Sequence, residues 1–414
     1  MKKLALLIAF HFPPQAASSG IQRTLSFSKH LGKYGWEPMV LSAHPRAYSH
    51  QNPSQLASVP EDLVVRRVFA LDTKRHLGIK GRYPELLALP DRWISWWLGA
   101  IPAGLSLIHE HKPQVIWSTF PIATSHLIGL TLHRLTGLPW VADFRDPMLQ
   151  SSYPSSTLQR KLYGWIERQT IMRCRMAVFT THSAMDAYRK RFPQLPASKF
   201  TVIENGYDEE GFDMEAFARQ AAAPALNRRL TLLHSGVLYQ TGRDPSAFLQ
   251  AIATLKASGQ IDAARLRVVL RAPGEIDQVR ALAQKYGIAD VVEVAPAIPY
   301  RDALHEMLAA DGLLVFQGTP FNTQIPAKIY EYFRAQKPIL GLVDTDGETA
   351  RVLRAAGFHS VASMDRSDAI APVLAQFVDQ IACGGAHIAS DELVAASSRT
   401  HRASQLADVL QQAL

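Results

Sequence analysis

The chain has 414 residues, which is too long for one ordinary hydrophobic core and suits two domains. Hydrophobic residues make up 47% of it and charged residues 19%, a globular balance that excludes a disordered or fibrous protein. The formal net charge of +8 favours anionic partners, such as a nucleotide diphosphate, an anionic lipid surface or nucleic acid.

The two cysteines, Cys174 and Cys383, lie far apart and show no metal-ligand spacing. This argues against a disulfide framework or a zinc site, so we expect no metal and a reducing, cytoplasmic setting. The apolar run 4–10 is short and ends at two prolines, which favours a buried first strand over the alternative of a signal peptide. No stretch of about 20 apolar residues is present, so we expect no membrane-spanning helix.

Short apolar runs alternate with longer amphipathic stretches in the first half of the chain. We predict strands at residues 4–10, 38–42, 115–118, 140–143 and 176–180, and helices at 20–34 and 122–135. Strand–helix–strand alternation indicates a parallel sheet wrapped by helices. The strands read as continuous apolar runs, as expected when both faces of a sheet are buried.

The same alternation begins again near Leu230. Predicted strands at 230–233, 266–270, 291–294, 312–316 and 339–343 alternate with predicted helices at 245–258, 277–286, 300–309 and 326–335. We therefore predict an α/β protein with two Rossmann-like, doubly wound parallel-sheet domains that face each other across a cleft. The predicted divisions are residues 1–205, a linker at 206–228, a second domain at 229–390 and a helical tail at 391–414.

The segment after Ile325 combines a helix start with two charged side chains. Pro326 suits the first position of a helix, and Pro338 disfavours its continuation. Lys328 then lies in the first turn, where a free helix N-terminus and a lysine form a cradle for an anion. Glu331 lies on the same side of the helix, where its carboxylate can accept hydrogen bonds from hydroxyls such as those of a ribose. A surface Lys–Glu pair remains the alternative.

Loops that follow predicted strands carry further candidates. Gly236 follows one strand of the second half and lets the backbone approach a ligand closely. Arg243 can donate two parallel hydrogen bonds from its guanidinium to a diphosphate. An ordinary turn with a solvated arginine is the alternative. In the first half, Asp143, Arg145 and Asp146 end a strand, where the carboxylates can orient an acceptor hydroxyl and Arg145 can pair with one of them. A salt-bridged loop is the alternative there.

The run Glu331-Tyr332-Phe333-Arg334-Ala335-Gln336-Lys337-Pro338 resembles the second half of the Glu-x7-Glu signature of family-4 retaining glycosyltransferases, which have the GT-B fold. The resemblance includes the run Asp143-Phe144-Arg145-Asp146-Pro147 and spans most of the chain. It implies that Glu331 binds the nucleotide ribose. The first Glu of the signature falls on Thr323, so the donor sugar is left unassigned.

The resemblance also implies a set of roles. The catalytic residues would be Arg243, Lys328 and Asp143; the donor site Gly20, Gly236, Arg243, Arg271, Pro299, Lys328 and Glu331; and the acceptor side Arg145 and Asp146. The implied reaction transfers a hexosyl or hexosaminyl unit, with retention, from a UDP- or GDP-linked sugar. The acceptor would be a glycan or a lipid-linked molecule in cell-surface polysaccharide biosynthesis. No metal or other cofactor is required, because protein cations neutralise the diphosphate.

Two other functions remain open. One is a nucleotide-sugar epimerase of the same fold, and the other is a non-catalytic scaffold of polysaccharide assembly, which the change at Thr323 favours.

Basic residues precede a tryptophan-rich run. Lys74, Arg75, Lys80 and Arg82 come before Arg92-Trp93-Ile94-Ser95-Trp96-Trp97-Leu98, a combination that suits docking on an anionic membrane. This would place the protein peripherally at the inner face of the membrane. The alternative is a core helix with its tryptophans packed inward. No nucleic-acid-binding motif accompanies the basic residues, so we expect no nucleic-acid partner.

Overall fold

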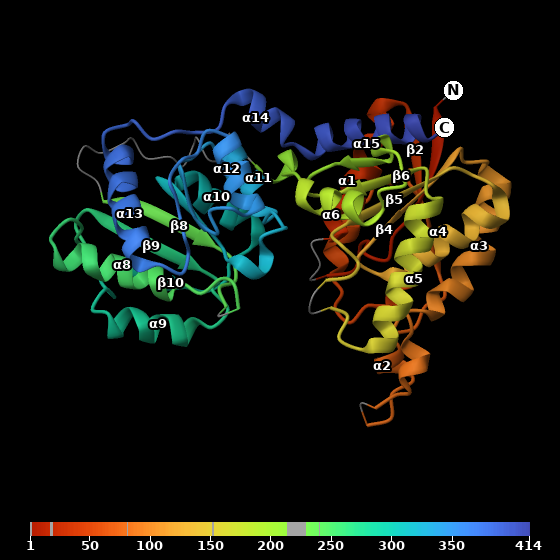
Figure 1. The fold of residues 1–414 in the computed structure, drawn as a ribbon, viewed down its shortest axis with the longest axis horizontal. Coiled ribbons are helices and arrows are strands. Elements are labelled where there is room, and N and C mark those ends of the chain that lie inside the picture. Colours follow the sequence, from red (N-terminus) through yellow and green to blue (C-terminus); the bar gives the residue numbers. More distant parts are fainter. Residues whose placement is uncertain (1, 17–19, 81, 151–152, 213–228, 240) are drawn as a thin grey trace. The chain divides into compact units, whose positions relative to one another are not determined.

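The computed structural model describes residues 2–16, 20–80, 82–150, 153–212, 229–239 and 241–414 (Figure 1). The chain divides into two compact units. The first comprises Met1–Asn205 and Arg399–Leu414, and the second comprises Gly206–Ser398. Each unit contains one all-parallel sheet with alternating helices, which confirms the predicted doubly wound α/β class.

The first unit has a seven-stranded sheet of order β3-β2-β1-β4-β5-β6-β7. Its strands are β1 Lys3–Ile8, β2 Trp36–Ala43, β3 Val64–Val68, β4 Val115–Thr119, β5 Trp140–Arg145, β6 Met176–Phe179 and β7 Phe200–Val202. Its longer helices are α1 Gly20–His30, α3 Ser95–His111, α4 Ala123–Thr136, α5 Thr157–Arg173 and α6 His182–Arg191. Successive residues of β1 point to opposite faces, so Leu6 and Leu7 belong to two separate core clusters.

The second unit has a six-stranded sheet of order β10-β9-β8-β11-β12-β13. Its strands are β8 Leu230–Ser235, β9 Leu266–Arg271, β10 Val292–Ala295, β11 Gly312–Gln317, β12 Ile339–Val343 and β13 Val361–Ala362. Its helices are α8 Ser246–Ala257, α9 Ile276–Lys285, α10 Tyr300–Ala309, α11 Lys328–Ala335, α12 Glu348–Ala355, α13 Ser367–Ala382 and α14 Asp391–Ala396. Leu232 and Leu233 of β8 again enter clusters on opposite faces of the sheet.

The end of the chain is divided between the units. Helix α14 lies in the second unit, whereas α15, Arg399–Ala413, packs against α1 in the first unit (Figure 1). Leu406 and Leu410 of α15 are buried with Leu25 of α1, and Arg402 forms a 2.6 Å ion pair with Glu204. Of the predicted linker, residues 213–228 lie outside the described residues. No helix of the described chain is long and apolar enough to span a membrane.

Helix α11 starts two residues later than predicted. Its first helical residue is Lys328, because the carbonyl of Pro326 accepts a hydrogen bond from the backbone N–H of Ile329 at 3.0 Å and so closes a tighter turn. The helix ends at Ala335, and Gln336 takes a left-handed conformation with φ of 50° that caps it. Lys328 therefore occupies the first position of the helix.

Candidate functional site

The carboxyl ends of the parallel strands β8, β9 and β11 lie at one edge of the second sheet. The loops that leave β8 and β9 are joined there by backbone hydrogen bonds. Gly236 N–H donates to the carbonyl of Arg271 at 2.9 Å, and Leu238 N–H donates to that of Pro273 at 2.9 Å. The loop that carries Gly236 is thus held in place by its neighbour.

Gly236 is far along the chain from Lys328 and Glu331, yet the three predicted site residues come together at this edge. A Cβ atom on Gly236 would lie 3.3 Å from Lys328 Cε, so any side chain there would crowd the lysine. Lys328 Nζ lies 3.8 Å from Glu331 Oε2, and the Tyr300 hydroxyl donates to Glu331 Oε1 at 2.8 Å. Tyr300, which begins α10, was not predicted as a site residue.

The Oε2 atom of Glu331 is buried and accepts no hydrogen bond from the described residues. A buried carboxylate oxygen that accepts no hydrogen bond lowers the stability of the fold. In native proteins such an oxygen usually binds a water, an ion or a ligand. This atom faces the Lys328 ammonium, so a ligand that binds here can offer hydroxyl donors to Glu331 and negative charge to Lys328.

Arg243 is held by a tight turn and two aromatic rings. The backbones of Tyr239 and Arg243 exchange hydrogen bonds of 3.2 and 3.1 Å, and the guanidinium lies over the rings of Tyr239 and Phe321 at 5.5 and 5.9 Å. One nitrogen, Nη2, donates to Gln317 Oε1 at 3.2 Å, whereas Nε has no hydrogen-bond partner among the described residues. The guanidinium of Arg243 is therefore held in one orientation, and part of its set of N–H donors is left to bind an anion.

The pKa of His234 reflects its burial and the positive charge near this edge of the sheet. The imidazole is buried, and its Nδ1–H donates to the carbonyl of Leu314 at 2.9 Å. Its pKa is lowered to about 4, chiefly by burial and further by the charges of Lys328 and Arg243, against an opposing effect of the Leu314 hydrogen bond. Two cations thus act on one neutral imidazole, and the edge of the second sheet is suited to an anion.

Arg271 and Pro299, also predicted for the donor site, have structural partners. The Arg271 guanidinium pairs with Glu306 at 2.9 Å from Nε to Oε2 and donates to the carbonyl of Pro296 at 2.9 Å. Its charge is therefore largely neutralised within the unit. Pro299 precedes α10 and sets the position of Tyr300.

In the first unit, Asp143 lies below the surface. Its side chain is 0% exposed and accepts from Arg23 Nε at 2.8 Å, Arg23 Nη2 at 2.9 Å and Thr119 Oγ1 at 2.9 Å. Because both carboxylate oxygens are occupied and covered, Asp143 cannot touch an acceptor in this arrangement. Arg23, on α1, was not singled out from the sequence.

Arg145 and Asp146 follow Asp143 at the end of β5. Arg145 has a φ of 60° and its Nη1 donates to the carbonyl of Phe120 at 3.3 Å. Burial raises the pKa of Asp146, and the Arg145 charge opposes that rise. Burial and the Arg145 charge lower the pKa of His11 to about 3.

Gly20 is buried at the start of α1, and the predicted loop residues 18–19 before it lie outside the described residues.

A cavity of about 440 Å³ opens in the first unit. It is lined by aromatic, aliphatic and hydrogen-bonding residues, namely Tyr83, Glu85, Ala88, Leu89, Asp91, Arg92, Trp93, Tyr153 and Gln159. The Trp93 ring lies 4.8 Å from that of Phe10, which follows β1, and Asp91 Oδ2 accepts from the backbone N–H of Thr124 at 2.8 Å. The cavity thus adjoins the carboxyl ends of β1 and β4, and its combination of residues was not predicted.

The sequence and the fold both resemble those of known proteins. Residues 20–206 match the model of the glycosyl transferase 4-like domain, and no curated protein matches the chain. HepE of Anabaena in complex with UDP is 12% identical, with a TM-score of 0.68 over 99% of both chains, and HepE has also been solved with UDP-glucose. Sucrose-phosphate synthase of Thermosynechococcus elongatus is 14% identical, with a TM-score of 0.63 over 99% of both chains. WaaG, a glycosyltransferase involved in lipopolysaccharide biosynthesis, is 15% identical, with a TM-score of 0.56 over 98% of this chain and 95% of its own.

Proposed function

We propose that the chain is a glycosyltransferase that transfers a hexosyl or hexosaminyl unit from a nucleotide diphosphate, with retention, to a glycan or lipid-linked acceptor. The match of residues 20–206 to the glycosyl transferase 4-like domain and the GT-B fold support this proposal. The observation that carries the proposal is the buried Oε2 atom of Glu331, which accepts no hydrogen bond from the described residues and lies 3.8 Å from Lys328 Nζ. A nucleoside diphosphate supplies what both groups need, since its ribose has hydroxyl donors and its phosphates are anionic.

The donor would lie at the edge of the second sheet. Glu331, oriented by Tyr300, would accept from the ribose, while Lys328 and Arg243 would face the diphosphate. Gly236 leaves room for the phosphates beside the lysine. In this role Arg271 would be a positioning residue, because it holds the loop of Gly236 through its backbone carbonyl. UDP is the first nucleotide to test, as HepE binds it in a structure of the same fold.

The chemical task of these groups is to stabilise the negative charge that develops on the departing diphosphate. Oriented cations in a site with little water do this more effectively than solvent, because they need not reorganise during the reaction. Arg243 is held over two aromatic rings and by Gln317, so its orientation is set before the donor arrives. No metal ion is needed for this step in the proposed scheme.

The acceptor would bind the first unit. Arg145 and Asp146 would face it, and the buried pair of Asp143 with Arg23 would position them rather than touch the acceptor. The cavity beside Trp93 would hold a sugar of the acceptor, since aromatic rings with nearby amide and carboxylate groups suit the two faces and the hydroxyls of a pyranose. We place the reaction in cell-surface polysaccharide biosynthesis, at the inner face of the membrane.

Calorimetry with UDP and UDP-glucose tests the donor site. We expect the wild-type chain to bind both, Lys328→Ala to bind them at least tenfold more weakly, and Lys285→Ala, an exposed lysine of α9, to bind as the wild type does. If Lys328→Ala binds normally while folded, the donor-site assignment is wrong. If no nucleotide sugar binds at all, the non-catalytic scaffold is favoured, for which the exposed Thr323 at the place of the first signature Glu is the supporting observation.

A further inference from the structure

Residues 72–92 of the first unit, described except for residue 81, project from the sheet as a segment that we call the finger (around α2 in Figure 1). It contains the short helix α2, Thr73–His76, and the turn Glu85–Ala88. The proposed donor site does not include it, and two of the most exposed large apolar side chains of the described residues lie on it.

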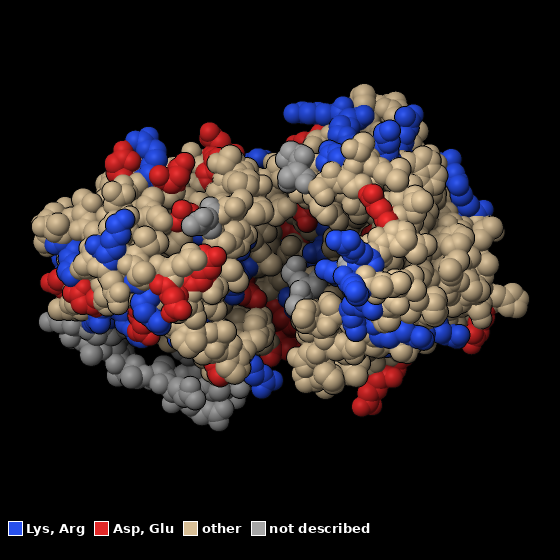
Figure 2. Space-filling view, turned by 90° about the horizontal axis from the view of Figure 1, so that it is seen from below, with Lys and Arg blue, Asp and Glu red and all other residues tan. Residues whose placement is uncertain are grey.

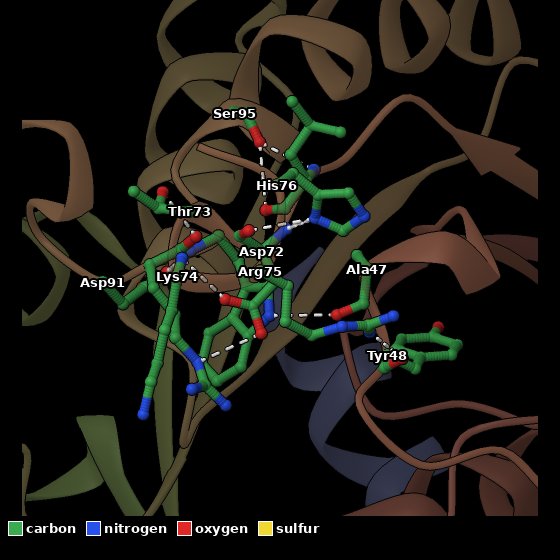
Figure 3. Close-up of polar contacts among 12 residues, drawn as sticks. Ala47, Tyr48, Asp72, Thr73, Lys74, Arg75, His76, Asp91 and Ser95 are labelled. Atoms are coloured by element: carbon green, nitrogen blue, oxygen red, sulfur yellow. Dashed lines mark hydrogen bonds and ion pairs between the residues drawn. The ribbon is translucent and has the colours of Figure 1, made fainter. Parts of the chain in front are cut away.

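The base of the finger is fastened by several polar contacts (Figure 3). Thr73 Oγ1 donates to the carbonyls of Leu87 and Arg92, each at 2.9 Å, which ties the two ends of the finger together. Arg75 donates to the carbonyl of Tyr48, outside the finger (Figure 3). The buried Asp72 accepts from the backbone N–H of Lys74 at 3.1 Å and lies 3.6 Å from Arg92 Nε. These contacts hold the finger in one conformation.

The tip of the finger is a tight turn. The backbones of Ile79 and Arg82 exchange hydrogen bonds of 2.9 and 3.0 Å. Gly78 lies so close to the preceding turn that a Cβ atom there would come within 2.3 Å of the Lys74 carbonyl oxygen, so only glycine fits. The chain is therefore shaped to present the residues of the tip.

The finger exposes four aliphatic side chains. Leu77 and Ile79 lie at or beside the tip, and Leu86 and Leu87 lie in the turn Glu85–Ala88. Ile79 is 80% exposed and Leu86 is 72% exposed. Single exposed aliphatic side chains are common on protein surfaces, but a preformed projection that exposes four of them marks a surface that an apolar partner covers.

Basic residues are interspersed with the aliphatic ones along the finger. Lys74, Arg75, Lys80 and Arg82 are exposed, and none of them forms an ion pair with a carboxylate of the described residues. Asp72 and Asp91 at the base of the finger are buried, so Glu85 is the only exposed acidic residue among the described residues of the finger. Figure 2, which views Figure 1 from below, shows several blue Lys and Arg side chains on this face of the unit at the right. The finger thus combines unpaired positive charge with apolar surface.

The tryptophans of the following run do not supply this surface. Trp96 is fully buried, and Trp93 and Trp97 pack against the core of the first unit. The Trp93 indole N–H donates to the carbonyl of Ala47 at 3.2 Å, and that of Trp97 to Thr131 Oγ1 at 3.0 Å. The alternative of an inward-packed helix therefore describes the tryptophans, whereas the apolar surface comes from the finger before them.

We propose that the finger docks on an anionic lipid surface, with Ile79 and Leu86 entering the boundary between headgroups and acyl chains and the basic residues contacting the headgroups. Aliphatic side chains among lysines and arginines fit a lipid interface. A protein interface is instead enriched in Tyr and Trp and depleted in Lys at its centre.

The finger also forms one wall of the cavity beside Trp93, through Tyr83, Glu85 and Leu89. A docked finger would therefore bring that cavity to the lipid headgroups, which is where the sugar of a lipid-linked acceptor lies. The role of the cavity in acceptor binding depends on the proposed function. The docking itself needs no substrate and can be measured without one.

Vesicle co-sedimentation of the full chain tests the proposal. The vesicles contain equal amounts of phosphatidylglycerol and phosphatidylcholine, or phosphatidylcholine alone. We expect binding to the anionic vesicles that weakens as salt is added. Lys74→Glu and Lys80→Glu should each lower partitioning by at least roughly fivefold, because loss of one positive charge near the surface is worth about that much and each change also adds a negative charge. Ile79→Asp with Leu86→Asp should abolish binding, and both sites are exposed enough for the fold to tolerate the change.

Matched controls carry the same changes elsewhere on the first unit, Leu135→Asp on α4 and Lys190→Glu on α6, both exposed. They should bind vesicles as the wild type does. Equal binding by the finger variants and the wild type would overturn the proposal, and so would equal binding to neutral vesicles. A wild-type chain that self-associates through Ile79 and Leu86 and ignores vesicles would show that a second copy covers the finger. Binding of UDP by the finger variants should be unchanged, so that a failure of docking is distinguished from a failure of the donor site.

Discussion

The Tyr300 hydroxyl donates a 2.8 Å hydrogen bond to Glu331 Oε1, while Glu331 Oε2, on the same carboxylate, accepts none from the described residues. Tyr300 begins α10 and Glu331 lies in the first turn of α11, so two helix starts hold the carboxylate by one oxygen. The other oxygen is left for a ligand beside Lys328.

Glu331→Ala should weaken UDP binding by about tenfold to a hundredfold, because a hydrogen bond to a charged group contributes about 1.5–3 kcal/mol. The loss should depend on the ribose. A dideoxy-UDP that lacks both ribose hydroxyls should bind the wild type and Glu331→Ala equally, as measured by calorimetry. An equal loss of affinity for both nucleotides in the variant would mean that Glu331 does not contact the ribose.

Arg243→Lys should lower the turnover number with a donor by about tenfold to a thousandfold while the affinity for UDP changes much less. Lysine keeps the positive charge, but it lacks the planar fork that Tyr239, Phe321 and Gln317 hold in place. Steady-state release of UDP from UDP-glucose gives the turnover number. Arg280→Lys on α9, where the arginine is exposed, serves as the control. A parallel loss of UDP affinity would instead indicate a role in ground-state binding.

Asp143→Asn should destabilise the first unit by about 3–5 kcal/mol, because it leaves the buried Arg23 without its carboxylate partner. Denaturant unfolding followed by tryptophan fluorescence measures this, since Trp117 and Trp140 lie in the core of that unit. Asp146→Asn, at a less buried site without this bidentate pair, should cost much less. Equal stability of the two variants would contradict the positioning role given to Asp143.

His234 should make the stability of the second unit sensitive to mild acid. Its pKa is lowered to about 4 in the folded chain, from 6.5, first by burial and then by Lys328 and Arg243. The unfolded chain therefore binds the proton more readily, so this stability is fully present above pH 6.5 and is lost as the pH falls toward 4. The expected loss is about 3 kcal/mol over that window.

His234→Gln should flatten this part of the pH dependence, as measured by chemical denaturation of the whole chain at several pH values. The buried His11 and His126, whose pKa values are lowered to about 3, keep their own acid sensitivity in both proteins and so cancel in the difference. An unchanged pH dependence in the variant would mean that His234 is protonated equally in the folded and unfolded chain.

The alternating apolar runs were enough to predict the parallel α/β class and most of the strands. The strands that were not predicted are short or lie at sheet edges. Strand β3 reads Val-Val-Arg-Arg-Val and buries only part of its length, and β7 and β13 have three and two residues. A strand at the edge of a sheet, or a strand of two or three residues, does not produce a continuous apolar run. The pattern of apolar residues therefore does not predict it.

The amino-acid sequence by itself determined the two sheets, the start of a helix near Pro326 and the identities of Lys328, Glu331, Gly236 and Arg243 as candidates, because periodicity and local motifs depend on neighbours along the chain. Tertiary structure alone decided which distant residues meet. Arg23 reaches Asp143 across 120 residues, and α15 joins the first unit because its apolar side is buried against α1. It also decided that the tryptophans are packed inward while Ile79 and Leu86 face the solvent, since burial depends on the surface against which a segment packs.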